Sequence, residues 1–304
     1  MIRRQIFNDS VWIDVERPSA SEVKALIREF GISELIAEEL RSPTIRPKAE
    51  YFRDQIYLVL HYPKIRQKKT GRTQLEIDFV VGEDFLITAH YEPIPEIQEF
   101  QKVAEVSGLI GHGQKIGHSG AVLLSLLGHL YKSLINELEF ISSSIEEIEN
   151  GIFNGKEREM VFALSSASKK LLDMKKAISM HKDILISLEA PGENILGKDF
   201  GLRLKTVYGE YYKAATIIES GLDFINELRE TNNSLLTTKQ NEIMQILTIM
   251  TFVALPLSLI LAIFQIDTVS RPIVGGRGDF WLLLLLILVI AMTLLFFFKK
   301  KKWL

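Results

Sequence analysis

The sequence predicts a mixed α/β domain at the N-terminus, followed by a long-helix region and two C-terminal transmembrane helices. Three observations carry this prediction. Short β-branched runs recur at close spacing through residues 1–118. Apolar residues then recur at helical spacing through residues 119–240. Residues 241–304 contain two long apolar runs, and the second of them, 280–298, has no charged residue, proline or glycine.

Composition excludes several classes of protein. The 304 residues carry a formal net charge of −2, so the chain lacks the basic surface of a nucleic-acid-binding protein. It has no cysteine, which excludes disulfides and thiolate metal sites. The histidines are scattered without an HExxH pattern, and no ATP-binding motif is present. We therefore expect neither an enzyme nor a bound cofactor.

The N-terminal region, 1–118, alternates strand-type and helix-type runs. Helices are expected at 19–29 and 32–40, the first capped by Ser19 or Ser21 with Glu22 in its first turn. Strands are expected where apolar and β-branched residues cluster, at 10–15, 54–62, 74–81 and 84–89. This mixture predicts an α/β domain, and the opening segment MIRRQIFNDS lacks the apolar core of a cleaved secretory signal.

The middle region, 119–240, is predicted to be a helical stalk. Residues 125–153 form a helix with an acidic polar face, and 158–188 form a basic helix, which favours an antiparallel pair. Each exposed ion pair between them contributes well under about 1 kcal/mol. Residues 199–264 are predicted to form one helix roughly 100 Å long. A helix of that length needs partner helices, either from this chain or from another copy.

The C-terminal region, 241–304, is predicted to be a transmembrane hairpin with helices at about 243–264 and 280–298. Each run is long enough to cross a hydrocarbon core of about 30 Å. The basic tail, Lys299, Lys300, Lys301 and Lys302, follows the second helix directly. Lysines beside a membrane span favour the cytoplasmic side. We therefore expect a multi-pass protein of the cell (inner or plasma) membrane with both termini in the cytoplasm.

One stripe of the first transmembrane helix is weakly polar. Two helices cannot enclose an aqueous path, so conduction requires several copies around an axis. Steps of three and four residues place the small or weakly polar side chains on one face: Met244, Leu247, Thr251, Leu255, Ser258 and Ala262. A stripe of small residues also suits close helix packing, and spacing alone favours packing over pore lining.

A resemblance supports the pore interpretation. From Asn241 the chain reads NEIMQILTIMTFVALPLSLILAIF, and it ends in FKKKKWL. Both segments resemble the CorA family of magnesium and cobalt transporters. Further family segments occur in the same order: WIDVERPSASEVKALIREFGI, IRPKAEYFRDQIYLVLHYP and FVVGEDFLITAHYEPIPEI. The resemblance therefore covers nearly the whole chain.

The resemblance implies a CorA-like funnel: a homopentamer that passively transports divalent metal ions, with Mg²⁺ first and Co²⁺, Ni²⁺ or Zn²⁺ as alternatives. The expected partners are other copies of this chain, the lipid bilayer and the divalent cations. Its pore-facing positions fall on Asn241, Met244, Leu247, Leu255, Ser258 and Ala262, nearly the stripe described above. Apolar rings such as Met244 and Leu247 can gate a pore by dewetting. Glu230 is a candidate for a cytosolic acidic ring, and Lys299–Lys302 would surround the stalk.

The chain departs from the family pattern at two places. The Gly-Met-Asn signature positions hold Gln265, Ile266 and Asp267, so the candidate entrance carries a charge in place of an amide. Asp267 either recruits a divalent ion or caps the span in headgroup water. In the stalk, Thr206 and Gly209 replace the aspartates that bind regulatory metal in some relatives. Metal sensing at that place is therefore not expected.

Two alternative functions remain open on the same scaffold. One is a zinc-type or non-selective cation transporter, with or without proton coupling. The other is a non-conducting membrane sensor or scaffold that has kept the fold and lost the pore.

Overall fold

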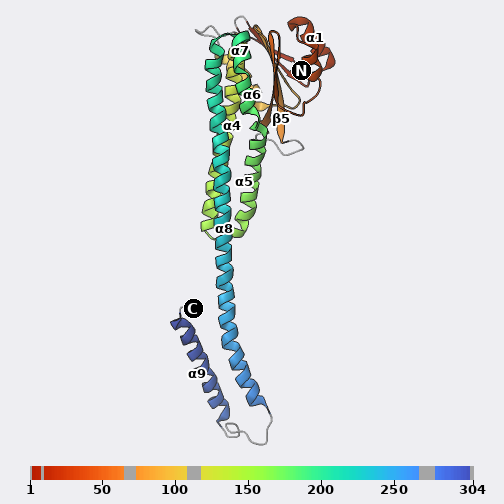
Figure 1. The fold of residues 1–304 in the computed structure, drawn as a ribbon. Coiled ribbons are helices and arrows are strands. Elements are labelled where there is room, and N and C mark those ends of the chain that lie inside the picture. The colour runs from red at the N-terminus through yellow and green to blue at the C-terminus, as the bar shows by residue number, and fades with distance from the viewer. Residues whose placement is uncertain (1, 8–9, 65–72, 108–117, 267–277, 302–304) are drawn as a thin grey trace. The chain divides into compact units, whose positions relative to one another are not determined.

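The computed structural model describes residues 2–7, 10–64, 73–107, 118–266 and 278–301. The chain forms two compact units, Met1–Arg229 and Glu230–Leu304, and the helix α8 (Asp199–Gln265) contributes to both (Figure 1). The first unit contains a β-sheet and a bundle of helices. The second contains the end of α8 and the helix α9 (Asp279–Lys300).

The sheet of the first unit has six strands in the order β1-β2-β6-β5-β4-β3. Only β2 and β6 pair in parallel, with Ile13 opposite Ile87, and the other neighbours are antiparallel. The strands run over β1 Ile2–Phe7, β2 Ser10–Glu16, β3 Lys48–Phe52, β4 Gln55–Pro63, β5 Gln74–Val81 and β6 Phe85–His90. The central strands are almost wholly buried because helices cover both faces.

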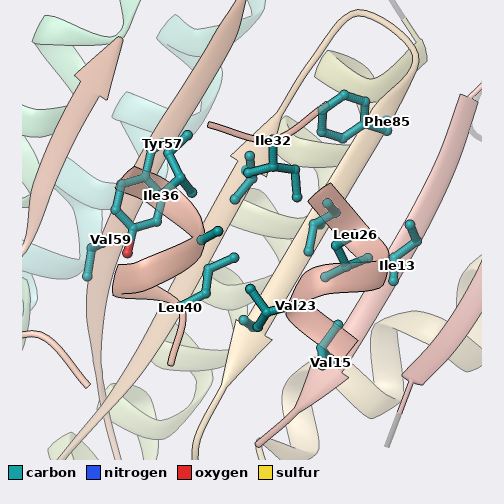
Figure 2. Packing of buried hydrophobic residues seen from close by; sticks show 14 residues of the cluster. Ile13, Val15, Val23, Leu26, Ile32, Ile36, Leu40, Tyr57, Val59 and Phe85 are labelled. Carbon is teal, nitrogen blue, oxygen red and sulfur yellow. The ribbon is translucent and has the colours of Figure 1, made fainter. Parts of the chain in front are cut away.

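One face of the sheet is covered by α1 (Ala20–Phe30) and α2 (Glu34–Glu39). Ser19 and Glu22 form a reciprocal capping box at the start of α1, and Gly31 ends the helix in the left-handed conformation. Apolar side chains of both helices pack onto β2, β4 and β6 (Figure 2). Leu26 and Ile36 are each 1% exposed, so this layer is a continuous core.

The opposite face is covered by a helical layer that ends in α8. Its other members are α3 Pro95–Ser107, α4 His118–Phe153, α5 Glu157–Ile178, α6 His181–Ser187 and α7 Glu189–Leu196. His181 on α6 connects the helical layer to the sheet. Its Nε2 donates to the carbonyl oxygen of His61 on β4 at 2.9 Å. Its Nδ1 accepts from the hydroxyl of Tyr131 on α4 at 2.7 Å. The ring of Tyr211 on α8 packs against both side chains.

The expected fold class is confirmed, and three details of the prediction were wrong. The strands β1 and β3 and the helix α3 were not predicted. Residues 158–188 form most of α5 and all of α6 instead of one helix, because the chain breaks at Met180 and turns His181 into the interior. The helix predicted from residue 125 begins at His118. The long helix over 199–264 and the second apolar helix are present as predicted.

Candidate ion pathway

Two helices of the described chain are long and apolar enough to cross a bilayer, α8 and α9. In α8 the apolar stretch belongs to the second unit, after Glu230. Most of its side chains are exposed, and so are most of those of α9. Such exposure of large apolar residues does not suit water, whereas a hydrocarbon environment covers them.

The transmembrane part of α8 has one partly covered face. A second face, the weakly polar stripe, is exposed throughout. The covered residues are Ile249, Val253, Pro256, Leu257, Ile260 and Phe264. The helix α9 lies beside this part of α8, and its own covered positions recur at the same helical spacing (Figure 1). At about 100° per residue, the covered face and the weakly polar stripe point about 180° apart.

The weakly polar stripe therefore does not pack against the partner helix of the same chain. All seven predicted pore-lining residues are exposed: Asn241, Met244, Leu247, Thr251, Leu255, Ser258 and Ala262. In the isolated chain Met244 is 56% exposed and Leu255 is 62% exposed. Within one chain the packing against α9 uses the other face, so the choice between close helix packing and pore lining concerns further copies of the chain. The stripe remains open to further copies.

Hydroxyl groups on this helix are satisfied locally. Thr251 donates to the carbonyl oxygen of Leu247 at 2.9 Å, and Ser258 donates to that of Ala254 at 2.8 Å. Thr248 donates to Met244 in the same way at 2.7 Å. A hydroxyl bound to its own helix costs little in a bilayer, and its oxygen keeps lone pairs for a passing water molecule. These groups can contact a hydrated cation through its water shell.

The polar stripe extends further toward the first unit than the sequence analysis identified. Glu230 lies three turns before Asn241 on the same side of α8 and is exposed, and its place in an acidic ring stays a prediction. Asn233 and Thr237 lie between them on that side, both exposed, and Thr248 continues the stripe. Extending the helical spacing backward from Asn241 would have found Asn233 and Thr237.

The candidate entrance is described only in part. Gln265 is the last residue of α8, and the backbone amide of Ile266 donates to the carbonyl of Ile263 at 3.3 Å. Both side chains are exposed. Asp267, the candidate metal-contacting residue, lies outside the described residues. Its role at the entrance stays a prediction.

The basic tail begins at the end of α9. Lys299 and Lys300 are exposed in its last turn, where a positive charge opposes the negative end of the helix dipole. The ammonium of Lys301 lies 5.7 Å from the ring centre of Phe297. Lys302 lies outside the described residues.

Within the described ranges no group of three His, Cys, Asp or Glu side chains is placed to hold a metal ion. In the stalk, Thr206 is exposed and offers no carboxylate. Tyr208 and Tyr212 pack against each other nearby, with ring centres 5.6 Å apart. Between Asn241 and Ala262 the stripe of one chain therefore offers neutral oxygens and apolar surfaces. Such contacts suit a cation that keeps its water.

The sequence of this chain is similar to the sequences of known proteins. A family model described as "CorA-like Mg2+ transporter protein" matches residues 7–300. The chain is 26% identical to the putative metal ion transporter YfjQ of Bacillus subtilis, over 86% of this chain and 79% of that protein. It is 23% identical to the cobalt/magnesium transport protein CorA of Thermotoga maritima, over 88% of this chain and 76% of that protein.

The fold also has a solved counterpart. The complete structure of the CorA magnesium transporter from Methanocaldococcus jannaschii superposes with a TM-score of 0.82. The match covers 97% of this chain and 92% of that one, at 22% sequence identity. At this identity the match shows the shared fold.

Proposed function

The chain belongs to the CorA-like Mg²⁺ transporter family, and on that premise we propose that it carries divalent cations across a membrane as a homopentamer. The pore is lined by the weakly polar stripe of α8 from each copy. Mg²⁺ is the first candidate ion, and Co²⁺, Ni²⁺ and Zn²⁺ are the alternatives. Both termini lie in the cytoplasm, and the predicted regions 1–118, 119–240 and 241–304 are the cytosolic α/β domain, the cytosolic helical stalk and the membrane hairpin.

One observation carries this proposal: the weakly polar stripe of α8 points away from the face that α9 covers. A lipid-facing helix surface needs no regular row of asparagine, threonine and serine. A row of this kind on the free side of a span is expected where water or a neighbouring copy meets it. Five copies around an axis satisfy both requirements.

The proposed transport is passive. A divalent ion that moves through about 100 mV releases about 4.6 kcal/mol, twice the value for a single charge. The stripe holds no ionised side chain between Asn241 and Ala262, so an ion is not trapped on the way. The side chains of Met244 and Leu247 would form the dewetting gate.

The position of the stripe can be tested by cross-linking, because the chain has no native cysteine. Ser258→Cys should form disulfide-linked dimers in membranes under mild oxidation, because one thiol per chain makes one disulfide. Leu257→Cys is the matched control on the covered face and should remain monomeric on a denaturing gel. Cross-links at Leu257 without any at Ser258 would place the stripe away from the shared axis.

The function itself is tested by ion flux into liposomes that contain the purified chain. Mg²⁺ uptake that responds to membrane potential is expected, with competition by Co²⁺. The absence of Gly-Met-Asn favours a second candidate, a zinc-type or non-selective transporter, which stronger competition by Zn²⁺ or dependence on a pH gradient would support. No flux of any cation would favour the non-conducting scaffold.

Asp267 is the proposed ion-recruiting residue at the entrance. Neighbouring carboxylates about 7 Å apart in a ring would repel one another by about 2 kcal/mol at an effective dielectric constant near 20. Such a ring binds a divalent cation more tightly than amides do. Asp267→Asn should therefore change the uptake rate or the order of ion competition. Asp279→Asn, the same change at the start of α9, is the control and should leave both unchanged.

A further inference from the structure

Asp78 is an acidic residue at a fully buried position, where acidic residues are rarely found. It lies on β5 in the centre of the sheet and is 0% exposed. The hydroxyl of Tyr91 donates to its Oδ2 at 3.0 Å. Its Oδ1 is buried and has no hydrogen-bond donor. An ionised carboxylate with one unsatisfied oxygen in a core is costly, and protonation removes the charge.

Other acidic groups surround Asp78. The carboxylate of Glu76 lies two residues away on the same strand face, is 7% exposed, and accepts from the backbone amide and hydroxyl of Thr44. The ammonium of Lys48 on β3 pairs with Glu39 on α2 and with Glu50 on β3, at 2.7 and 2.8 Å.

The remaining neighbours do not neutralise Asp78 either. The hydroxyl oxygen of Tyr57 on β4 is buried without a partner, and its ring faces α2 (Figure 2). The imidazole Nε2 of His61 lies 3.8 Å from Glu76 and faces that carboxylate. Burial raises the pKa of Asp78 well above its usual value, and the charges of Glu76 and Glu39 raise it further. A hydrogen bond between the carboxyls of Asp78 and Glu76 acts in the same direction and requires a proton between them.

We propose that Asp78 is a proton-binding site: it carries a proton on Oδ1 at neutral pH, shares it with Glu76, and couples its release to the packing of the stalk helix. The regulatory half of this inference rests on the proposed transport function. On release, the O–H bond of Asp78 breaks and the proton passes to water. A cavity of about 450 Å³ supplies that water, since Glu76 and Tyr91 line it together with His61.

The coupling follows a continuous chain of contacts. Loss of the proton places a second negative charge beside Glu76, which faces His61. The backbone oxygen of His61 accepts from His181, and the ring of His181 packs against Tyr211 on α8. On the other side, Tyr91 also donates to the carbonyl of Glu39 at 3.4 Å, so α2 is tied to the same group. Ionisation of Asp78 therefore affects both helical layers of the first unit, the layer with α2 and the layer with α8.

The proton itself is tested by infrared difference spectroscopy on the full chain in detergent. A carbonyl band of a protonated carboxylic acid is expected at neutral pH, and it should disappear in Asp78→Asn. Asp84→Asn, an exposed aspartate beyond the end of β5, is the matched control and should keep the band. A spectrum of the wild-type chain without this band would overturn the proposal.

Should Asp78→Asn fail to fold, Glu76→Gln tests the same site. Removing the neighbouring charge should shift the pH at which the band disappears to lower values. An unchanged titration would show that the two carboxyls do not interact and would overturn the shared proton.

The regulatory half is tested by cation flux in liposomes with the internal pH varied between about 6 and 9, the range in which buried carboxyls titrate. Flux through the wild-type chain should change severalfold with internal pH, and flux through Asp78→Asn should not. Equal pH profiles would overturn the coupling. A chain that shows the carbonyl band and carries no cation at any pH would instead contradict the proposed function, and the proton site would stand.

Discussion

The two halves of α8 have similar helical spacing of apolar residues and opposite exposure. In the first half, Phe200 and Ala214 are fully buried, at 0% exposure, by helices of the same chain. In the second half, Met244 and Leu255 are more than half exposed. The first unit thus covers its own apolar surface. The second unit leaves its apolar surface exposed, and under the proposed function a bilayer and further copies cover it.

From this difference we expect the first half of α8 to determine the stability of a single chain and the second half to determine assembly and ion flux. Substitutions before Arg229 should act on the folding of a single chain. Substitutions after Glu230 should act on assembly and ion flux. Four predictions test this division, from the largest expected effect to the smallest.

Phe200→Ala should destabilise the first unit by about 3–5 kcal/mol, because the ring fills the space against Gly120 and Gly192. Chemical denaturation followed by near-ultraviolet circular dichroism measures the effect. The matched change in the second half is Met244→Ala, which should leave that transition unchanged and alter the cation flux. Equal losses of stability in the two variants would abolish the distinction between the halves.

Acid should weaken the contact between His181 and Tyr211 of α8. Burial lowers the pKa of His181 to about 4. Between about pH 6.5 and that value the unfolded chain binds a proton that the folded chain does not, so stability falls as the pH falls. The total loss is about 3 kcal/mol.

The variant His181→Gln separates this contribution from other acid effects. Its amide can accept from Tyr131 and donate to His61, and it does not titrate. Denaturation midpoints measured at several pH values should therefore fall less steeply in the variant than in the wild-type chain. Parallel curves would assign the acid sensitivity to other groups.

Ser19→Ala should cost about 1 kcal/mol, because it removes the capping box at the start of α1. Ser33 is the N-cap residue of α2 and makes no side-chain cap hydrogen bond, so Ser33→Ala is the control and should cost less. Thermal unfolding of the two variants gives the comparison. A larger loss at Ser33 would mean that the local cap does not determine the start of α1.

Thr251→Val should change the stability by no more than about 0.5 kcal/mol, since the hydroxyl bonds only to its own helix and the shape is kept. Its effect should appear in transport, where the axis loses one hydroxyl oxygen per copy. Flux in liposomes is expected to decrease while the oligomer seen by size-exclusion chromatography is retained. Unchanged flux together with dissociation of the oligomer would make Thr251 a packing residue.

The sequence alone determined the features that depend on local pattern. The apolar run 280–298 predicted a helix long and apolar enough to cross a membrane, from its length and composition alone. The long helix over 199–264 followed from uninterrupted helical spacing, and side-chain chemistry narrowed the cap of α1 to Ser19 or Ser21, of which the structure selects Ser19. The weakly polar stripe was also visible, because helical periodicity places residues on a face without knowledge of any neighbour.

Tertiary structure decided the features that depend on contacts between segments that are distant in the sequence. The edge strands β1 and β3 have mixed polar and apolar residues, and only pairing with β2 and β4 makes them strands. The break before His181 arises because two partners distant in sequence, His61 and Tyr131, draw that side chain inward. Which face of α8 meets α9, and the burial of Asp78, likewise follow from contacts between distant segments, since neither leaves a periodic signal in the sequence.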